Sequence, residues 1–198
     1  MNITLYLSLL EKKYCNTIIH SNDKTQLKRF TSKKERLLSK IKQLECSVGS
    51  YTLKNNVSAP QESLVLYISP NPRDMVRATY NVIKRSIDLL QTKSIGFNIH
   101  AEALSAVQRS AGTKYFCDFD VDNKDIDISL IKDILPDDAY EILETRGGYH
   151  ILIKTKVAPK TRWHNQLRAI YDVDKTGDQF IPVPGCVQGG FIPRFITK

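Results

Sequence analysis

Paired cysteines are missing from this sequence. The chain of 198 residues holds only Cys15, Cys46, Cys117 and Cys186, which lie far apart, without a CxxC pair and without a neighbouring pair of histidines. This spacing argues against a structural zinc module and against a disulfide framework. We therefore expect reduced thiols, as in an intracellular protein.

Long hydrophobic runs are missing as well. No stretch approaches the roughly 20 apolar residues that a membrane-spanning helix needs. The first segment, MNITLYLSLLEKKY, is apolar only briefly, with no basic leader before the apolar residues and no small-residue cleavage site after them. It does not match a secretory signal. The sequence predicts a cytoplasmic protein, or one in the host cytoplasm if a virus or mobile element encodes it, with no membrane partner.

Acidic residues are outnumbered by basic ones. The chain has 29 Lys and Arg against 21 Asp and Glu, which gives a formal net charge of +8. Such a balance favours a polyanionic partner, of which nucleic acid is the most common.

Basic charge gathers near the N-terminus. Residues 22–45, NDKTQLKRFTSKKERLLSKIKQLE, are rich in Lys and Arg, and leucine or isoleucine recurs at helical spacing at 37, 38, 41 and 44. This pattern predicts a basic amphipathic helix, whose basic face is either solvated or turned toward phosphates. Polar residues 47–61 then suggest a boundary. We predict a basic, partly helical N-terminal extension over 1–60 and a folded core over 61–198.

The core alternates between β-rich runs and helical periods. Strands are predicted over 63–69, over 113–121 and on both sides of a Gly-Gly break within 139–157. Helices are predicted over 75–91, 101–109, 127–135 and 158–171. The tail over 179–198, punctuated by Pro and Gly, suits short strands and turns. This order predicts an α+β fold with a mixed or antiparallel sheet core and flanking helices.

One predicted strand carries carboxylates. In KYFCDFDVDNKD, residues 114–125, Asp118, Asp120 and Asp122 occupy alternate positions of an apolar run. In a strand these side chains share one face, where like charges repel and burial is costly unless a cation neutralises them. Two carboxylates one strand period apart can hold a pair of magnesium or manganese ions, as phosphoryl transfer requires. Asp122 already precedes a polar turn, and we assign it to that turn.

Residues 144–154, ETRGGYHILIK, combine features that suit phosphate binding. Arg146, two glycines and His150 fall within five positions, and glycine allows close backbone approach. A lone histidine is usually structural, but the nearby arginine and glycines favour contact of His150 with a triphosphate. A later group of carboxylates, more typical of a polar turn when taken alone, comprises Asp172, Asp174 and Asp178.

In this combined pattern the sequence resembles the archaeo-eukaryotic primase superfamily, the primase-polymerases. That family's first motif, an apolar strand ending in Asp-x-Asp, is matched by YFCDFD. Its second, a small residue, any residue and then histidine, is matched by Gly148, Tyr149 and His150. Its third, an apolar and an acidic residue before a Pro-Gly turn, is similar to IYDVD followed by PVPG. The intervals fit as well, with 30 residues from Asp120 to His150 and 22 from there to Asp172.

The resemblance implies a primase-polymerase (RRM-like) catalytic core with a two-metal site for Mg²⁺ or Mn²⁺. Asp118 and Asp120 would be metal ligands, and His150 would contact the phosphates of the incoming nucleotide. The third acid would be Asp172 or, with the strand register shifted by two, Asp174.

Two positions depart from the family pattern. Asp178 is a poorer match for the third acid than its neighbours are. Gly148 stands where the family usually has serine, so the hydroxyl contact to phosphate is either lost or supplied elsewhere, for instance by Thr145 or a backbone amide.

The function implied is a metal-dependent nucleotidyltransferase that makes or extends a primer from nucleoside triphosphates on a single-stranded DNA template. A helicase or other replication proteins would be its partners. Two alternatives stay open: a catalytically weak nucleic-acid-binding replication subunit, and a metal-dependent nuclease. Trp163 is expected to pack within its helix, and Tyr149 either stacks on a base or packs. The basic side chains expected to hold phosphates are Arg146, Arg194, Arg73 and Lys154.

Overall fold

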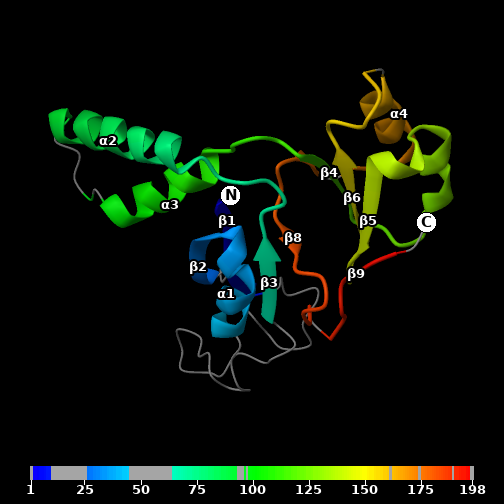
Figure 1. The fold of residues 1–198 in the computed structure, drawn as a ribbon, viewed down its shortest axis with the longest axis horizontal. Helices are drawn as coiled ribbons and strands as arrows, with labels where there is room; N and C mark the ends of the chain where they lie inside the picture. Colours follow the sequence, from blue (N-terminus) through cyan, green and yellow to red (C-terminus); the bar gives the residue numbers. More distant parts are fainter. Residues whose placement is uncertain are drawn as a thin grey trace.

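Two antiparallel sheets form the framework of the protein (Figure 1). The structure, a computed structural model, describes residues 2–9, 26–44, 64–92, 96, 98–160, 162–173, 175–188 and 190–196. The first sheet has the strand order β2-β1-β3-β8 and the second β7-β4-β6-β5-β9, and all of these pairings are antiparallel. Helices flank the sheets, so the fold is α+β with antiparallel sheets, as the sequence predicts.

The first sheet joins strands from distant parts of the chain. Its strands, in spatial order, are β2 (Gln26–Lys33), β1 (Asn2–Leu9), β3 (Leu64–Ile68) and β8 (Ile181–Pro182). β1 pairs with both β2 and β3, which satisfies the backbone groups that an isolated β3 would leave unpaired. Strands β1 and β2, from the described segments of 1–60, therefore share a sheet with the later strands β3 and β8.

The prediction of a helix over 22–45 is wrong for residues 26–33. Strand β2 occupies Gln26–Lys33, a 3₁₀ turn follows over Lys34–Arg36, and only Leu37–Leu44 is helical, as α1. The residues that carry the helical period all lie in 37–44, so periodicity is informative only there. The structure of residues 26–33 is instead decided by pairing with β1, a contact distant in sequence.

A helical hairpin, α2 (Met75–Gln91) and α3 (Ile99–Arg109), projects from the sheets on the side away from α4 (Figure 1). The Asp74 carboxylate caps α2 by accepting a hydrogen bond from the Arg77 amide at 2.9 Å. At the base of the hairpin the Asp74 amide donates to the Ser110 carbonyl at 2.8 Å. In the part of the chain that the structure describes, none of the helices combines the length and apolar character that a membrane span requires.

The second sheet carries the main hydrophobic core. Its strands, in spatial order, are β7 (Lys175–Gly177), β4 (Phe116–Val121), β6 (Tyr149–Lys154), β5 (Tyr140–Glu144) and β9 (Arg194–Phe195). One face is covered by α4 (Trp163–Ile170) and by 3₁₀ turns over Ile128–Asp133 and Asp137–Ala139. The predicted helix over 127–135 is thus a 3₁₀ segment, while the helix over 158–171 is present in a shorter form.

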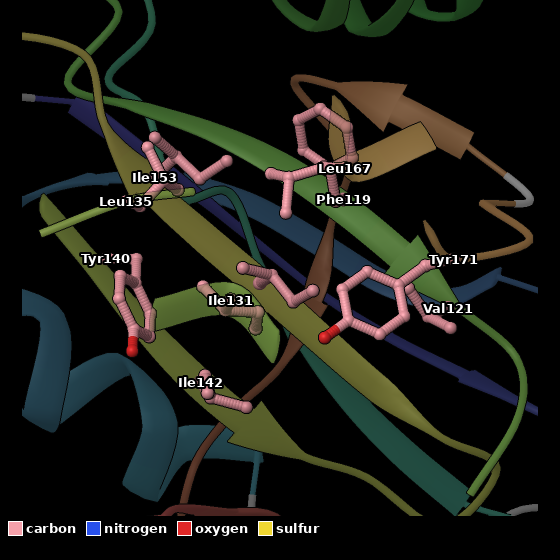
Figure 2. Packing of buried hydrophobic residues seen from close by; sticks show 10 residues of the cluster. Phe119, Val121, Ile131, Leu135, Tyr140, Ile142, Ile153, Leu167 and Tyr171 are labelled. Atoms are coloured by element: carbon pink, nitrogen blue, oxygen red, sulfur yellow. The ribbon is translucent and has the colours of Figure 1, made fainter. Parts of the chain in front are cut away.

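Apolar side chains from β4, β5 and β6 meet α4 and the 3₁₀ segment in this core (Figure 2). Phe119 and Ile151 are fully buried at its centre, together with Leu167 of α4. The Trp163 ring lies 5.9 Å from the Phe119 ring, measured between centroids, so Trp163 packs as expected. Burial of side chains of this size contributes about 1.5–3 kcal/mol each.

The opposite face of the second sheet turns toward the first sheet. There Leu143 and Leu152 pack with Ile181 of β8, and Ile68 and Phe116 pack against them. These contacts join the two sheets through a small apolar cluster. The carboxylates predicted to bind metal emerge beside this cluster.

Candidate active site

Asp118, Asp120 and His150 lie together on one face of the second sheet. In the β4–β6 register Asp120 is opposite His150, and Asp118 is opposite Leu152. Residues directly opposite in an antiparallel pair share a face, so these side chains turn toward the first sheet. Phe119, between the two carboxylates, points into the core on the other face. The alternation predicted for this strand is confirmed.

Asp122 lies outside the strand. β4 ends at Val121, and Asp122 is exposed in the loop that follows. The predicted end of the strand at Val121 is therefore confirmed, and Asp122 lies beyond it.

His150 is held between the two carboxylates. Its Nδ1 lies 2.9 Å from Oδ2 of Asp118, and its Nε2 lies 3.7 Å from Oδ1 of Asp120. The side chains of Asp118 and His150 are 0% and 8% exposed, whereas that of Asp120 is 21% exposed. The site is thus closed at Asp118 and opens to solvent at Asp120.

The surroundings of His150 favour its charged form. Burial lowers the pKa of His150, but the hydrogen bond to Asp118 and the negative charges of Asp118, Asp120 and Asp122 outweigh burial and raise it overall. The imidazole therefore keeps its proton to a higher pH than a free histidine does.

One oxygen of Asp118 is buried without a partner. Its Oδ1 makes no hydrogen bond with any residue that the structure describes. An unsatisfied buried acceptor costs about 1–3 kcal/mol, and more when it is charged. Gly177, the residue opposite Asp118 on β7, has no side chain that could reach this oxygen. A bound cation would satisfy it.

The third acid is the weakest part of the predicted site. Within the described ranges, no group of three His, Cys, Asp or Glu side chains could hold a metal ion. Asp172 is exposed just beyond α4. Asp174 lies outside the described residues, while the backbone of the next residue, Lys175, is opposite Asp120 in the β4–β7 register. Asp118 and Asp120 are therefore the two predicted metal ligands that the structure brings together.

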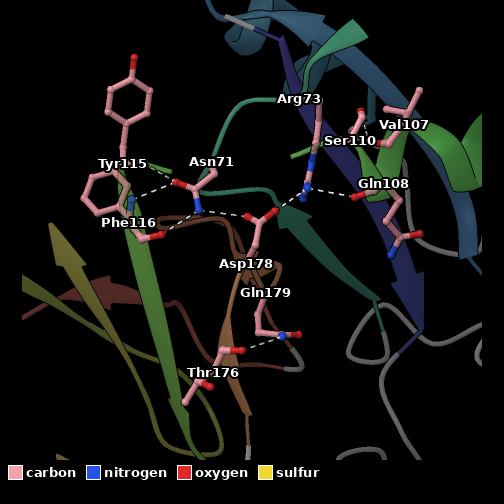
Figure 3. A network of polar contacts seen from close by, with 10 residues as sticks. All are labelled: Asn71, Arg73, Val107, Gln108, Ser110, Tyr115, Phe116, Thr176, Asp178 and Gln179. Atoms are coloured by element: carbon pink, nitrogen blue, oxygen red, sulfur yellow. Dashed lines mark hydrogen bonds and ion pairs between the residues drawn. The ribbon is translucent and has the colours of Figure 1, made fainter. Parts of the chain in front are cut away.

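Asp178 has a different role from the one considered for it. Its carboxylate pairs with Arg73, whose Nη1 lies 2.5 Å from Oδ2 and also donates to the Gln108 carbonyl at 3.0 Å (Figure 3). The Arg73 side chain is only 2% exposed. Arg73 therefore ties the base of the helical hairpin to the end of β7, and this contact occupies the guanidinium that the sequence assigns to phosphate.

Asn71, which sequence reasoning missed, completes this network (Figure 3). Its side-chain oxygen accepts hydrogen bonds from the amides of Tyr115 and Phe116 at 2.8 and 2.9 Å. Its side-chain nitrogen donates to the Phe116 carbonyl at 2.8 Å and to Asp178 Oδ1 at 3.0 Å. Asn71 is fully buried and fixes the start of β4, the strand that carries the site. An asparagine between two prolines in SPNPRD indicates a turn, but not these partners.

Gly148 is required by a close backbone approach. A Cβ at this position would lie 1.9 Å from the Val121 carbonyl oxygen, so serine does not fit here. The Thr145 hydroxyl donates to the Gly148 carbonyl at 3.1 Å and accepts from its amide at 3.2 Å. Thr145 is buried and closes the β5–β6 turn. Its hydroxyl is therefore committed to the turn and does not replace the serine of the family motif.

Two of the residues predicted to bind phosphate belong to β6 and to the turn before it: Lys154 is on β6, and Arg146 is in the turn between β5 and β6. Lys154 lies on the same face of β6 as His150, and its Nζ is 2.7 Å from Oε1 of Glu141. Arg146 follows β5, and its backbone amide donates to Gln188 Oε1 at 3.1 Å. Lys154 is thus the better placed of the two by strand register.

Arg194 lies on the other face of the sheet. It is opposite Glu144 on β5, Glu144 is opposite Tyr149 on β6, and Tyr149 is opposite Val121 on β4. Its Nε lies 3.0 Å from Oε2 of Glu144. The structure does not bring Arg194 together with Asp118 and His150.

The chain matches no protein-family model, no curated protein and no solved structure. The resemblance to the primase-polymerases therefore rests on the motif residues, and their geometry carries the functional argument.

Proposed function

We propose that this protein is a metal-dependent nucleotidyltransferase with a primase-polymerase type core, which makes or extends a primer from nucleoside triphosphates on single-stranded DNA. The observation that carries the proposal is the unpartnered, buried Oδ1 of Asp118 beside Asp120 and His150. A carboxylate that only stabilised the fold would be expected to use both oxygens.

The carboxylates fit a magnesium or manganese ion. Asp118 and Asp120 would hold it, since both are hard oxygen ligands one strand period apart and one of them has an oxygen to spare. When bound, such an ion neutralises charge on a triphosphate and makes a hydroxyl a better nucleophile. A second ion needs a further acid, for which Asp174 is the candidate.

The protein's own side chains would orient the triphosphate. Asp118 holds Nδ1 of His150 and thereby directs Nε2 toward Asp120 and the open side of the site. A protonated His150 can donate from Nε2 to a phosphate oxygen. The apolar cluster of Leu143 and Leu152 keeps water from the closed side, which strengthens these electrostatic contacts.

Primer synthesis with purified protein tests the proposal. Single-stranded DNA, nucleoside triphosphates and manganese should yield oligonucleotides, and Asp118→Asn or Asp120→Asn should reduce product to background. Asp122→Asn is the matched control, because it removes an equal charge from the exposed loop next to the same strand. If both strand variants were as active as the parent, the proposed site would be wrong.

A binding role without catalysis is the alternative that one observation favours, since the described residues bring only two carboxylates to the site. In that case the protein would bind DNA in a salt-sensitive manner, while Mn²⁺ calorimetry would detect no metal binding and no oligonucleotide would form. Degradation of labelled DNA without added nucleotides would instead indicate a nuclease.

A further inference from the structure

A basic groove lies between the two helices of the hairpin, apart from the site at Asp118. It has a volume of about 590 Å³ and is lined along α2 and α3. Four cationic side chains line it against two carboxylates. They are Arg77, Lys84, Arg85 and Arg109, with Asp88 and Glu102 as the carboxylates.

Helical spacing arranges these charges along the groove. Arg77 and Lys84 are seven residues apart on α2, which places them on one face about 10 Å apart along the axis. Arg109 lies at the hairpin base with Arg77, because the Asp74 amide donates to the Ser110 carbonyl there. Asp88 and Glu102 lie nearer the connection between the helices. The groove is therefore most basic at its base.

The groove cations are not neutralised from within the protein. Among the residues that the structure describes, none of the four makes an ion pair or a side-chain hydrogen bond, and all four are exposed. The contrast with Arg73 is direct, since that arginine is buried and paired with Asp178. Cations that share a groove repel one another, so an anion in the groove would relieve this repulsion.

We propose that the α2–α3 groove binds the phosphodiester backbone of a single-stranded nucleic acid. The cations are spread along the groove instead of converging on one point, which suits a row of phosphates better than a single phosphate group. Three of the four cationic side chains are arginines, and an arginine can form two parallel hydrogen bonds to one phosphate. Only the identification of this strand as the template rests on the proposed function.

Fluorescence anisotropy of a labelled 20-nucleotide oligothymidine, without metal or nucleotides, tests the groove. Arg77→Ala with Arg109→Ala should weaken binding by about tenfold and reduce the slope of log K against log salt by about 1.4, since each phosphate contact on a single strand contributes about 0.7. Arg77→Lys with Arg109→Lys should keep that slope. All of these side chains are exposed, so far-UV circular dichroism and melting temperature should not change.

The matched control is Lys132→Ala with Lys160→Ala, which removes the same charge from exposed positions outside the groove. If this control weakened binding as much as the groove variant does, net charge alone would explain binding and the proposal would be overturned. It would also be overturned if the groove variant lost affinity for poly-L-glutamate but not for oligothymidine, which would identify an acidic peptide as the ligand.

This test and the test of catalysis can fail separately. Asp118→Asn should bind oligothymidine as the parent does, because Asp118 does not line the groove. Binding by the groove in a parent protein that makes no primer would reject the proposed function and leave the groove assignment intact. Primer synthesis that is unaffected in a groove variant with unchanged DNA affinity would reject the groove alone.

Discussion

Nδ1 of His150 lies 2.9 Å from Oδ2 of Asp118, across two strands that are neighbours in the sheet although the residues are 32 positions apart in the chain. The pair is buried, and its two components depend on each other. Asp118 fixes the orientation of the imidazole, and His150 provides the hydrogen-bond partner of Oδ2 and, when protonated, a positive charge beside the buried carboxylate.

Removal of His150 should therefore destabilise the protein. We expect His150→Ala to lower the free energy of unfolding by about 3 kcal/mol, because Asp118 would be left buried without its cation. Urea denaturation in the presence of a chelator measures this effect. Manganese should restore part of the loss if Asp118 binds metal, and restoration should disappear in the double variant with Asp118→Asn. An unchanged unfolding midpoint in His150→Ala would contradict the pairing.

Replacement of Gly148 by serine, the residue that the family motif usually has, should destabilise the protein. We expect Gly148→Ser to cost about 3 kcal/mol or to prevent folding, because its Cβ would meet the Val121 carbonyl oxygen at 1.9 Å. Gly112→Ala is a milder comparison, since its Cβ would lie 3.2 Å from the Pro72 carbonyl oxygen. Melting temperatures of the two variants give the comparison, and equal values would show that the β5–β6 turn can shift.

The third acid can be identified by metal binding. We expect Asp172→Asn to leave Mn²⁺ affinity unchanged, because Asp172 is exposed beyond α4. Asp174→Asn should weaken it if Asp174 supplies the third ligand, because the chain enters β7 directly after Asp174 and β7 lies beside β4, the strand that carries Asp118 and Asp120. Isothermal titration calorimetry with manganese compares the two variants under the same conditions. The reverse result would assign the third ligand to Asp172.

Arg73 should contribute to stability more than to nucleotide binding. Arg73→Ala leaves the Asp178 carboxylate without its ion pair and frees the hairpin base, at a cost of about 3 kcal/mol. Asp178→Asn is the companion variant and should also be destabilising. Thermal unfolding measures both. A normal melting temperature together with a higher KM for nucleotide would instead support the phosphate role that the sequence suggests.

Glu144 should make a small, pH-dependent contribution to stability. Burial raises the pKa of Glu144, but hydrogen bonds from Arg194 and Lys124 outweigh burial and lower it overall. The folded pKa is thus below the unfolded one, so the contribution is present above about pH 4.5 and is lost as the pH falls through the folded pKa. We expect Glu144→Gln to lower stability by less than about 1 kcal/mol at pH 7, because Arg194 is largely exposed.

The measurement for Glu144 is urea denaturation of both proteins between pH 3 and pH 7. The difference between parent and Glu144→Gln should shrink toward the acid end. A difference that grows on acidification would mean that the sign of the pKa shift is wrong.

Local pattern alone was sufficient for most elements that follow residue 60. The apolar run before Pro70, the helical period of 75–91 and the alternation of Asp118 and Asp120 with Phe119 each lead to the correct element. In each case the signal comes from neighbours in sequence, because period two and period 3.6 place apolar residues on one face. The prediction of a helix over residues 26–33 is wrong, because the structure of this segment depends on pairing with β1 and not on its neighbours in sequence.

The sequence by itself determined the composition of the site: two carboxylates one strand period apart, and a histidine thirty positions later. Only the tertiary structure decided which groups meet. Strand register places His150 against Asp118 and Asp120 and sends Arg194 to the other face. Burial commits Arg73 to Asp178, and the crossing of the Gly148 backbone over Val121 excludes serine. Such contacts join residues distant in the chain, so no local pattern records them.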